Sequence, residues 1–284
     1  MRRRYGAMNA PPHSCWASWE LCIDLRRFRA ENAYQSQAYF LATLARYRLT
    51  TAYVEARDDS GWLRSLEEDG RFGAKLWPVA KGLNVTRDLL DSILELAWLK
   101  EMLDFGINDI IPVLDVGAGY GRLAHRFTNL FPRGSITCVD AIATSTFLCE
   151  FYLRYRQCER CQVLPFDEIG ELQAGKFTLA TNIHSWSEMP LAWVKHWLEL
   201  LSDLNIPYLF LVPNFADFKT KELDGCHGDF GPELDRHGYR CISKTRKYRY
   251  SAVAHELGVF PGDYYRSEER RVGKEFEYWG SPYH

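Results

Sequence analysis

The pattern of apolar positions changes along the chain near residue 106. Before that point, apolar residues recur at spacings of three and four, which predicts helices over 14–49 and from Thr86 to about Asp104. Thr86 is a suitable N-cap for the second helix, with Asp88 in its first turn. From Ile111 onward, short apolar runs alternate with helical segments. This alternation predicts an α/β fold with a mostly parallel sheet and helices on both faces.

Seven apolar runs in the second part of the chain predict strands. They lie at 111–116, 135–139, 162–164, 177–181, 206–212, 239–243 and near 263–265. Helices are predicted between them at 122–131, 143–156, 191–201 and 232–237. We therefore expect four regions: a disordered N-terminus over 1–13, a helical region over 14–105 that covers the site, a sheet domain over 106–265, and a tail over 266–284.

The tail has a different composition from the sheet domain. Residues 266–275 are almost all charged. The run Ser267–Lys274 and the ending Ser281–His284 resemble a tail that recurs on translated ends of assembled bacterial sequence. We expect this segment to be non-native to the domain or disordered, the alternative being a solvated charged tail. Without a final strand, one edge of the sheet would stay unpaired.

A glycine-rich turn follows the first predicted strand. Gly117, Gly119 and Gly121 leave room for a ligand to approach the backbone, and the next helix points free N–H groups at the turn. A dinucleotide site would place its third glycine where Arg122 stands. The spacing here is D-x-G-x-G-x-G and begins at Asp115. It is similar to the first motif of class I methyltransferases, with a nicotinamide site or an empty turn as alternatives.

Polar residues also follow the next strands of the predicted sheet, where α/β proteins bind ligands. Asp140 ends the second strand and is placed to accept hydrogen bonds from ribose hydroxyls, or alternatively to cap a helix. Phe166 and Asp167 follow the third strand, where they could hold adenine, although acidic loops are common at such positions.

The segment after the fourth strand carries the side chains best suited to move a proton. His184 titrates near neutrality and is the first candidate for a general base. Glu188 is the second candidate, or the group that orients His184. Both residues could instead cap the following helix.

Two further clusters could hold a metal. Cys158 and Cys161 form a single C-x-x-C pair without the second pair of a zinc ribbon, so we interpret them as a surface turn, with metal or redox use as the alternative. An acidic loop could bind Mg²⁺, although a solvated loop is commoner, and we assign no metal. Its candidate residues are Asp217, Glu222, Asp224, His227 and Asp229.

Composition limits the partners and the compartment. The chain has 284 residues, of which 46% are hydrophobic and 25% charged, as in soluble globular proteins. A net charge of −2 favours neither nucleic acid nor an anionic membrane, and no apolar run approaches the length of a membrane span. No secretory signal is apparent, so we expect a cytoplasmic protein whose eight cysteines are reduced. The oligomeric state is left open.

Several stretches together resemble the bacterial sugar O-methyltransferases of polysaccharide and natural-product gene clusters, a family of class I S-adenosyl-L-methionine (SAM) dependent methyltransferases. The resemblance covers about residues 20–265. The matching stretches are Asp69-Gly70-x-Phe72-Gly73, Arg87–Ile93, Gly117–Ala124, Val139-Asp140 and Asn182-x-x-Ser185-x-x-Glu188-Met189, with weaker matches at Asp224-Gly225 and Gly238-Tyr239. A departure occurs at Ala143, where a proline is expected.

The resemblance implies a Rossmann-like class I methyltransferase sheet with an N-terminal helical region, SAM as cofactor, and a sugar or glycoside as methyl acceptor. The residues assigned to the cofactor are Asp115, Gly117, Ala118, Gly119, Tyr120, Asp140, Ala141, Phe166, Asp167 and Asn182. The residues assigned to catalysis are His184, Ser185 and Glu188. The alternatives are a methyltransferase for another small molecule and a non-catalytic SAM-binding partner or sensor.

Overall fold

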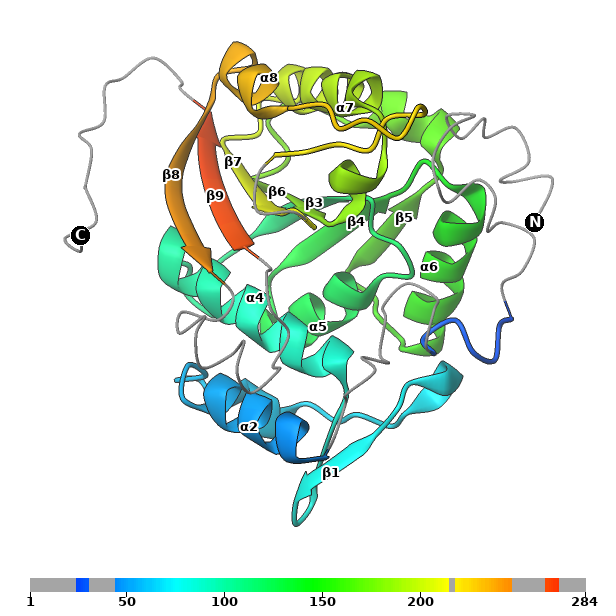
Figure 1. Cartoon of the computed structure of the whole chain (residues 1–284), viewed down its shortest axis with the longest axis vertical. Helices are drawn as coiled ribbons and strands as arrows, with labels where there is room; N and C mark the ends of the chain where they lie inside the picture. Colours follow the sequence, from blue (N-terminus) through cyan, green and yellow to red (C-terminus); the bar gives the residue numbers. More distant parts are fainter. Residues whose placement is uncertain (1–23, 31–43, 215–217, 247–263, 271–284) are drawn as a thin grey trace.

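The computed structural model describes residues 24–30, 44–214, 218–246 and 264–270. Within these residues the central element is a seven-stranded sheet with the strand order β5-β4-β3-β6-β7-β9-β8 (Figure 1). The strands are β3 (Pro112–Val116), β4 (Ser135–Val139), β5 (Cys161–Leu164), β6 (Leu179–Ile183), β7 (Tyr208–Val212), β8 (Tyr239–Arg246) and β9 (Tyr264–Arg270). The longer helices are α2 (Leu44–Glu55), α4 (Arg87–Leu103), α5 (Arg122–Leu130), α6 (Ala143–Tyr155), α7 (Leu191–Asp203) and α8 (Gly231–Arg236).

Strands β3 to β7 pair in parallel, whereas β9 pairs antiparallel with both β7 and β8. The chain runs outward from β3 to β5 and then returns to the other side of β3 with β6. This reversal beside β3 creates a topological switch point, where α/β proteins bind ligands. The predicted Rossmann-like sheet, mostly parallel and flanked by helices, is confirmed.

The sheet separates two hydrophobic clusters, because alternate residues of a strand point to opposite faces. In β7, for example, Phe210 packs in one cluster and Leu209 and Leu211 pack in the other. Helices α4, α5 and α6 contribute to the first cluster, and α7 and α8 to the second. Figure 1 shows α7 and α8 on one side of the sheet and α4 and α5 on the other.

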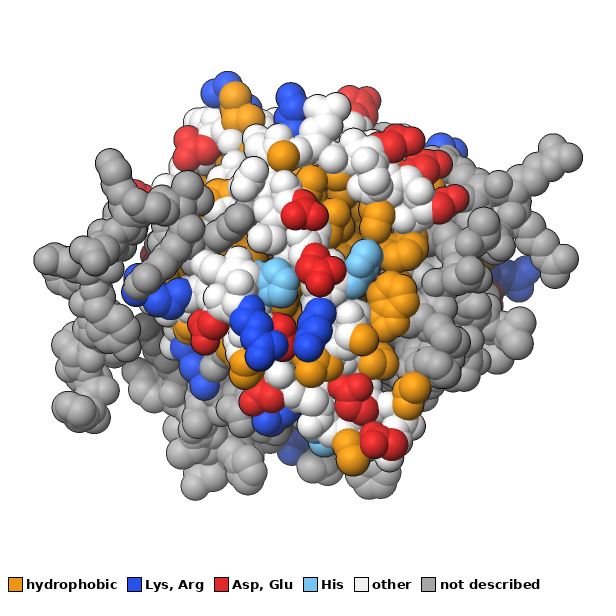
Figure 2. Space-filling view, turned by 90° about the horizontal axis from the view of Figure 1, so that it is seen from above, with side chains coloured by type: hydrophobic (Ala, Val, Ile, Leu, Met, Phe, Trp, Pro, Cys, Tyr) orange, Lys and Arg blue, Asp and Glu red, His pale blue; other side chains and the backbone are white. Residues whose placement is uncertain are grey.

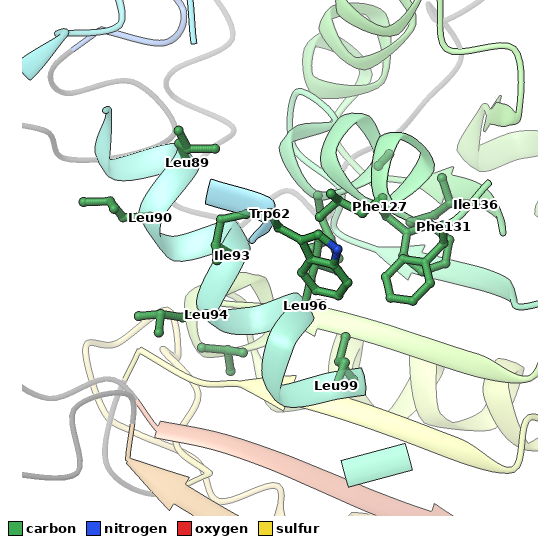
Figure 3. Packing of buried hydrophobic residues seen from close by; sticks show 14 of the residues in the cluster. Trp62, Leu89, Leu90, Ile93, Leu94, Leu96, Leu99, Phe127, Phe131 and Ile136 are labelled. Atoms are coloured by element: carbon green, nitrogen blue, oxygen red, sulfur yellow. The ribbon is translucent and has the colours of Figure 1, made fainter. Parts of the chain in front are cut away.

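Helix α4 supports the sheet from the first of these faces. Its start is the predicted one, because the Thr86 hydroxyl accepts a hydrogen bond from the Leu89 N–H at 3.1 Å. Figure 3 shows Trp62 between α4 and the pair Phe127 and Phe131, and Trp62 meets Phe131 edge to face with ring centroids 5.5 Å apart. The helix ends at Leu103, with Asp104 in a left-handed conformation (φ 51°), which agrees with the predicted end near Asp104.

The predicted helix over 14–49 is wrong for the part of it that the structure describes before residue 44. Residues 24–30 form turns, because the Asp24 carboxylate accepts a hydrogen bond from the Arg26 N–H at 2.8 Å and the Asp24 carbonyl accepts one from Arg27 at 2.9 Å. Helix α2 begins at Leu44 and continues beyond residue 49 to Glu55. Residues 1–23 and 31–43 lie outside the described ranges.

Three other elements differ from the sequence analysis. Strand β6 lies two residues later than predicted, because Asn182 and Ile183 continue its pairing with β7. A hairpin of β1 (Trp77–Ala80) and β2 (Leu83–Val85), turning at Gly82 (φ 73°), was not predicted. Strand β9 continues through Arg270, beyond the predicted limit near residue 265, and pairs with both β7 and β8. Residues 271–284 lie outside the described ranges.

Candidate functional site

A pocket opens at the carboxyl ends of β3, β4 and β6, at the switch point of the sheet. We call it the central pocket. Its lining residues are Asp115, Gly117, Ala118, Gly119, Tyr120, Arg122, Leu123, Asp140, Ala141, Ile142, Ser145, Ile183, His184, Ser185, Glu188, Met189 and Trp197. Ten of the thirteen residues assigned to the site from the sequence are therefore brought together by the fold.

The glycine turn forms one wall of the central pocket and folds tightly against β4. The N–H groups of Gly117 and Ala118 both donate to the Val139 carbonyl, at 2.8 and 3.2 Å. Gly117 has a φ of 75°, and a Cβ built on it would lie 2.0 Å from the Ser185 hydroxyl oxygen. Only glycine therefore fits here, both for its backbone conformation and for the space available.

Asp140 faces the glycine turn from the end of β4. Its carboxylate accepts hydrogen bonds from the Gly119 N–H at 3.0 Å and from the Ile142 N–H at 2.8 Å. Burial raises the pKa of Asp140 to about 7, and these two hydrogen bonds oppose the rise. Asp140 thus joins the glycine turn to the segment that leads into α6, and it also lines the central pocket, whereas α6 itself begins after Ile142 without a side-chain cap.

Asp115 is a second buried carboxylate beside the turn. It accepts a hydrogen bond from the Thr181 hydroxyl at 2.6 Å, across the parallel pair of β3 and β6. Burial raises the pKa of Asp115 to about 6, while the Thr181 hydrogen bond and the Arg122 guanidinium act in the opposite direction. The central pocket is therefore lined by two carboxyl groups that titrate close to neutral pH.

Residues of helix α4 that do not line the central pocket bind the side chains of Tyr120 and Arg122, which extend from the glycine turn. The Tyr120 hydroxyl donates to the Asp88 carboxylate, which also accepts from Arg29 Nε at 3.0 Å. Arg122 forms a two-point ion pair with Glu95, at 2.7 and 3.1 Å. Because these partners are buried, they fix Tyr120 and Arg122 more firmly than surface contacts could.

The Arg29 side chain extends this network to the start of the described chain. Arg29 is fully buried and also donates to Glu68 at 2.9 Å, and Glu68 accepts from Arg126 at 2.6 Å. These ion pairs join residues 24–30, the loop before β1, and helices α4 and α5. The helical region of the sequence analysis thus supports the turn from behind. No lining residue of the central pocket comes from the described part of 14–105.

The candidate catalytic residues lie on a short 3₁₀ turn, η3 (Ser185–Glu188), directly after β6. His184 precedes it with a φ of 69° and ψ of −35°, a conformation that residues other than glycine rarely adopt. Its N–H donates to the Val212 carbonyl of β7 at 2.7 Å, which fixes the backbone there. The Glu188 carboxylate accepts from the Asn214 amide at 2.8 Å.

Asn182 lies beneath this turn and does not line the central pocket. Its side-chain amide donates to the Val116 carbonyl at 2.8 Å and to the Ser185 hydroxyl at 2.6 Å. Its amide oxygen accepts from the Trp186 N–H at 3.2 Å. Asn182 therefore connects β3 to η3 and sets the position of Ser185 against Gly117.

Phe166 and Asp167 also lie outside the lining of the central pocket. They begin the 3₁₀ turn η2 (Phe166–Glu171) after β5. The Phe166 ring packs edge-on against the Trp197 ring, with centroids 5.7 Å apart, so it supports a wall of the pocket from behind. Asp167 is exposed.

Seven lining residues were not assigned from the sequence: Arg122, Leu123, Ile142, Ser145, Ile183, Met189 and Trp197. Three of them, Ile142, Ile183 and Met189, are direct sequence neighbours of an assigned residue, so proximity in sequence could have indicated these three. Trp197 had no such signal, because it comes from the middle of α7. Its side chain is 1% exposed, and among the described residues its indole Nε1 has no hydrogen-bond partner.

The acidic loop after β7 is used for local hydrogen bonds. The Glu222 carboxylate accepts from the Leu191 N–H at 2.9 Å, at the start of α7, and Asp229 pairs with Lys219 at 3.1 Å. In the described ranges, no three His, Cys, Asp or Glu side chains are grouped so that they could hold a metal ion. Asp217 lies outside those ranges.

The surface over α7 and α8 mixes both signs of charge (Figure 2). Glu233, for instance, lies between Lys195 at 3.1 Å and Arg236 at 2.5 Å. Acidic and basic side chains therefore lie side by side on the described part of this face. Among the helices that the structure describes, none has the length and apolar character needed to cross a membrane.

Solved structures of other proteins share the arrangement of sheet and helices seen in this chain. No protein-family model and no curated protein matches the chain. A SAM-dependent methyltransferase from Aquifex aeolicus is 17% identical with a TM-score of 0.45, over 61% of this chain and 88% of that one. Magnesium protoporphyrin IX methyltransferase from Synechocystis PCC 6803, solved with bound SAM, is 13% identical with a TM-score of 0.45, over 78% and 97%.

The [4+2]-cyclase SpnF is also similar, with 15% identity and a TM-score of 0.47 over 80% of this chain and 94% of that one. Similarity at this level concerns the arrangement of the sheet and helices, and it does not identify the reaction of this chain.

Proposed function

We propose that this protein is a SAM-dependent O-methyltransferase that methylates a hydroxyl of a small molecule, with a sugar or glycoside as the acceptor. The observation that carries the proposal is the meeting of Gly117, Gly119 and Asp140 in one pocket at the switch point of the sheet. A glycine turn bonded to an acid from the neighbouring strand is a site for a nucleoside-containing ligand.

The lining of the central pocket fits SAM in three respects. The turn presents backbone without side chains at Gly117 and Gly119, so an amino-acid group can approach closely. Asp140 offers carboxylate oxygens to ribose hydroxyls. Ala141, Ile142 and Trp197 supply apolar walls for a flat base. When bound, SAM supplies a methyl group on a positively charged sulfur, which an acceptor oxygen can displace in line.

A nicotinamide dinucleotide fits this turn less well. The third glycine of a dinucleotide motif allows close packing between the helix and the strand. Arg122 stands at that position, and its guanidinium is held by Glu95 and by the Ser92 hydroxyl at 2.9 Å. The position therefore carries a long, fixed side chain instead of a glycine.

The residues on and beside η3 provide the chemistry for a hydroxyl acceptor. A sugar hydroxyl has a pKa far above 7, so its proton must be taken as the new bond forms. His184 and Glu188 both line the central pocket and are half-buried, which places two proton acceptors on one wall. In this proposal a ring nitrogen of His184 accepts the proton of the acceptor hydroxyl, and Glu188 orients the acceptor. The Asn214 amide fixes one oxygen of Glu188.

The sugar acceptor is the narrower part of the proposal. It is supported by the resemblance of Asn182, Ser185, Glu188 and Met189 to the sugar O-methyltransferase signature. In the structure Ser185, Glu188 and Met189 line the pocket, and Asn182 holds Ser185 in place. Ser185 and Glu188 could accept or donate hydrogen bonds to neighbouring hydroxyls of a sugar ring.

The test is calorimetric titration of S-adenosylhomocysteine into the full chain and into two variants. Asp140→Ala should weaken binding at least tenfold, which corresponds to about 1.4 kcal/mol. Asp203→Ala, at an exposed position at the end of α7, is the matched control and should bind like the wild type. Absence of binding to the folded wild-type chain would refute the cofactor assignment.

The acceptor is tested separately with nucleotide sugars and glycosides, following the methylated product by mass spectrometry. His184→Ala should abolish turnover while S-adenosylhomocysteine affinity is retained. Turnover of a different small-molecule class alone would reject the sugar assignment. Tight cofactor binding without any turnover, unchanged in the His184 and Glu188 variants, would indicate a binding protein instead of an enzyme.

A further inference from the structure

The Cys158–Cys161 pair lies outside the central pocket, in the connection between α6 and β5. The Cys161 N–H faces the Cys158 carbonyl at 3.4 Å, so the four residues form a hydrogen-bonded turn. The ends of such a turn are less than about 7 Å apart between Cα atoms. A disulfide spans roughly the same distance, about 4.4–6.8 Å. The backbone therefore already holds the two cysteines within bridging distance.

The Cys161 thiol lies against helix α5. Cys161 Sγ lies 3.7 Å from the Thr128 hydroxyl and 3.8 Å from the Ala124 carbonyl, both on α5. Hydrogen bonding to the Cys161 thiol lowers the pKa of Cys158. The Thr128 hydroxyl and the guanidinium groups of Arg156 and Arg126 lower it further, whereas partial burial of Cys158 opposes the shift. Cys158 is thus the better nucleophile, and Cys161 is the adjacent partner.

Solvent reaches this pair. Both cysteines are half-buried and line a hollow beside α6 and β5, together with Glu150, Arg154 and Glu168. By contrast, Cys138 and Cys149 are each 1% exposed, and their pKa values are raised. Cys226 is exposed, but hydrogen bonding to Asp224 raises its pKa. Access and thiolate character therefore coincide at Cys158.

We propose that Cys158 and Cys161 form a redox-active dithiol that closes reversibly to a disulfide by exchange with a low-molecular-weight disulfide such as glutathione disulfide. The Cys158 thiolate attacks one sulfur, forming a mixed disulfide and releasing one glutathione thiolate. Cys161 then loses its proton to solvent and attacks Cys158 Sγ, releasing the second glutathione thiolate. The dithiol is oxidised by two electrons, and glutathione disulfide is reduced to two molecules of glutathione.

The position of Arg160 makes this proposal directly testable by peptide mapping. Trypsin cleaves after Arg160, between the two cysteines, so the fragments 157–160 and 161–176 stay joined only if the disulfide has formed. The reduced full chain is incubated with glutathione disulfide, quenched with an alkylating reagent, digested and analysed by mass spectrometry. The linked pair of fragments should accumulate at least tenfold faster than the glutathione adduct of Cys226.

Three variants separate the steps. Cys161→Ser should stop the reaction at the glutathione adduct of Cys158, and Cys158→Ser should slow modification of Cys161 at least tenfold. Cys226→Ser is the matched control and should leave the linked fragments unchanged. The proposal fails if the folded wild-type chain, with an unchanged melting temperature, yields separate adducts on Cys158 and Cys161. It also fails if the linked fragments appear only after denaturation.

Discussion

The Ser185 hydroxyl occupies the space beside Gly117 in which a side chain would begin. A Cβ on Gly117 would lie 2.0 Å from Ser185 Oγ and 2.6 Å from Ser185 Cβ. The contact brings the glycine turn after β3 against the 3₁₀ turn after β6. It therefore couples the proposed cofactor wall of the central pocket to its proposed acceptor wall.

Replacing Gly117 with alanine should disturb both walls. The clash requires Ser185 to move, and the left-handed φ of 75° adds strain of about 1–2 kcal/mol for a residue with a Cβ. We expect at least tenfold weaker S-adenosylhomocysteine binding and a lower melting temperature. Gly175→Ala is the matched control, because Gly175 has a similar φ of 73° but nothing within 4 Å of the added Cβ. Equal affinity of both variants would contradict the role of the Ser185 contact.

The raised pKa of Asp140 should make stability depend on pH in a defined direction. The carboxyl group has a pKa of about 7 in the folded protein against an ordinary pKa of 3.8, so between these values the folded state binds more protons than the unfolded state. Ionisation of Asp140 therefore costs stability as pH rises towards 7. Between pH 5 and 8, the free energy of unfolding of the wild type should fall by on the order of 2–3 kcal/mol relative to Asp140→Asn.

Urea unfolding of both proteins at several pH values measures this difference. In the Asp140→Asn variant, the side-chain amide cannot accept hydrogen bonds from both the Gly119 and the Ile142 N–H groups. This loss of stability does not change with pH, so it cancels when the difference between the two proteins is compared across pH values. A difference that stays the same from pH 5 to 8 would show that the Asp140 carboxyl group titrates normally in the folded protein.

The buried ion pairs of Arg29 should matter more than their surface counterparts. Arg29→Met leaves the Glu68 and Asp88 carboxylates buried with fewer partners, and such a change costs about 3–5 kcal/mol. Arg64→Met removes an ion pair with Glu55 in which Arg64 is 63% exposed, and should cost less than about 1 kcal/mol. Thermal or urea unfolding measures both. Similar small losses for the two variants would mean that residues 24–30 contribute little to the fold.

The indole N–H of Trp197 should contribute to binding of the adenosine part of the ligand. Trp197→Phe keeps an aromatic wall but removes a buried donor that has no partner among the described residues. We expect five- to tenfold weaker binding of adenosine and of S-adenosylhomocysteine by calorimetry. Trp186→Phe removes a second such donor that does not line the central pocket, so it should leave adenosine affinity unchanged. Loss of affinity in both variants to the same extent would indicate a general packing effect.

Local sequence patterns predicted most of the sheet domain. Apolar runs placed β4 at its observed bounds, and Thr86 marked the start of α4, because strand formation and N-capping depend on residues close in sequence. The glycine turn and Asp140 were identified for the same reason: each follows directly after a strand. The fold then brings the ends of β3, β4 and β6 together, as expected for a parallel sheet.

The features that were missed depend on contacts between distant residues. Asn182 is polar and looks like a loop residue, but Val116 and Ser185 satisfy its amide, so β6 continues through it. Trp197 reaches the central pocket only because α7 packs across the sheet. Arg29 looks like a surface cation, yet it is buried because Glu68 and Asp88 approach it from elsewhere in the chain.

The sequence by itself thus determined the fold class, the glycine turn and most strand positions, because these follow from periodicity and local hydrogen bonding. Only the tertiary structure decided which side chains support the turn, which ones line the central pocket, and that Ser185 fills the space beside Gly117. Those outcomes depend on packing and on the pairing of buried charges across long sequence separations, which no local pattern encodes.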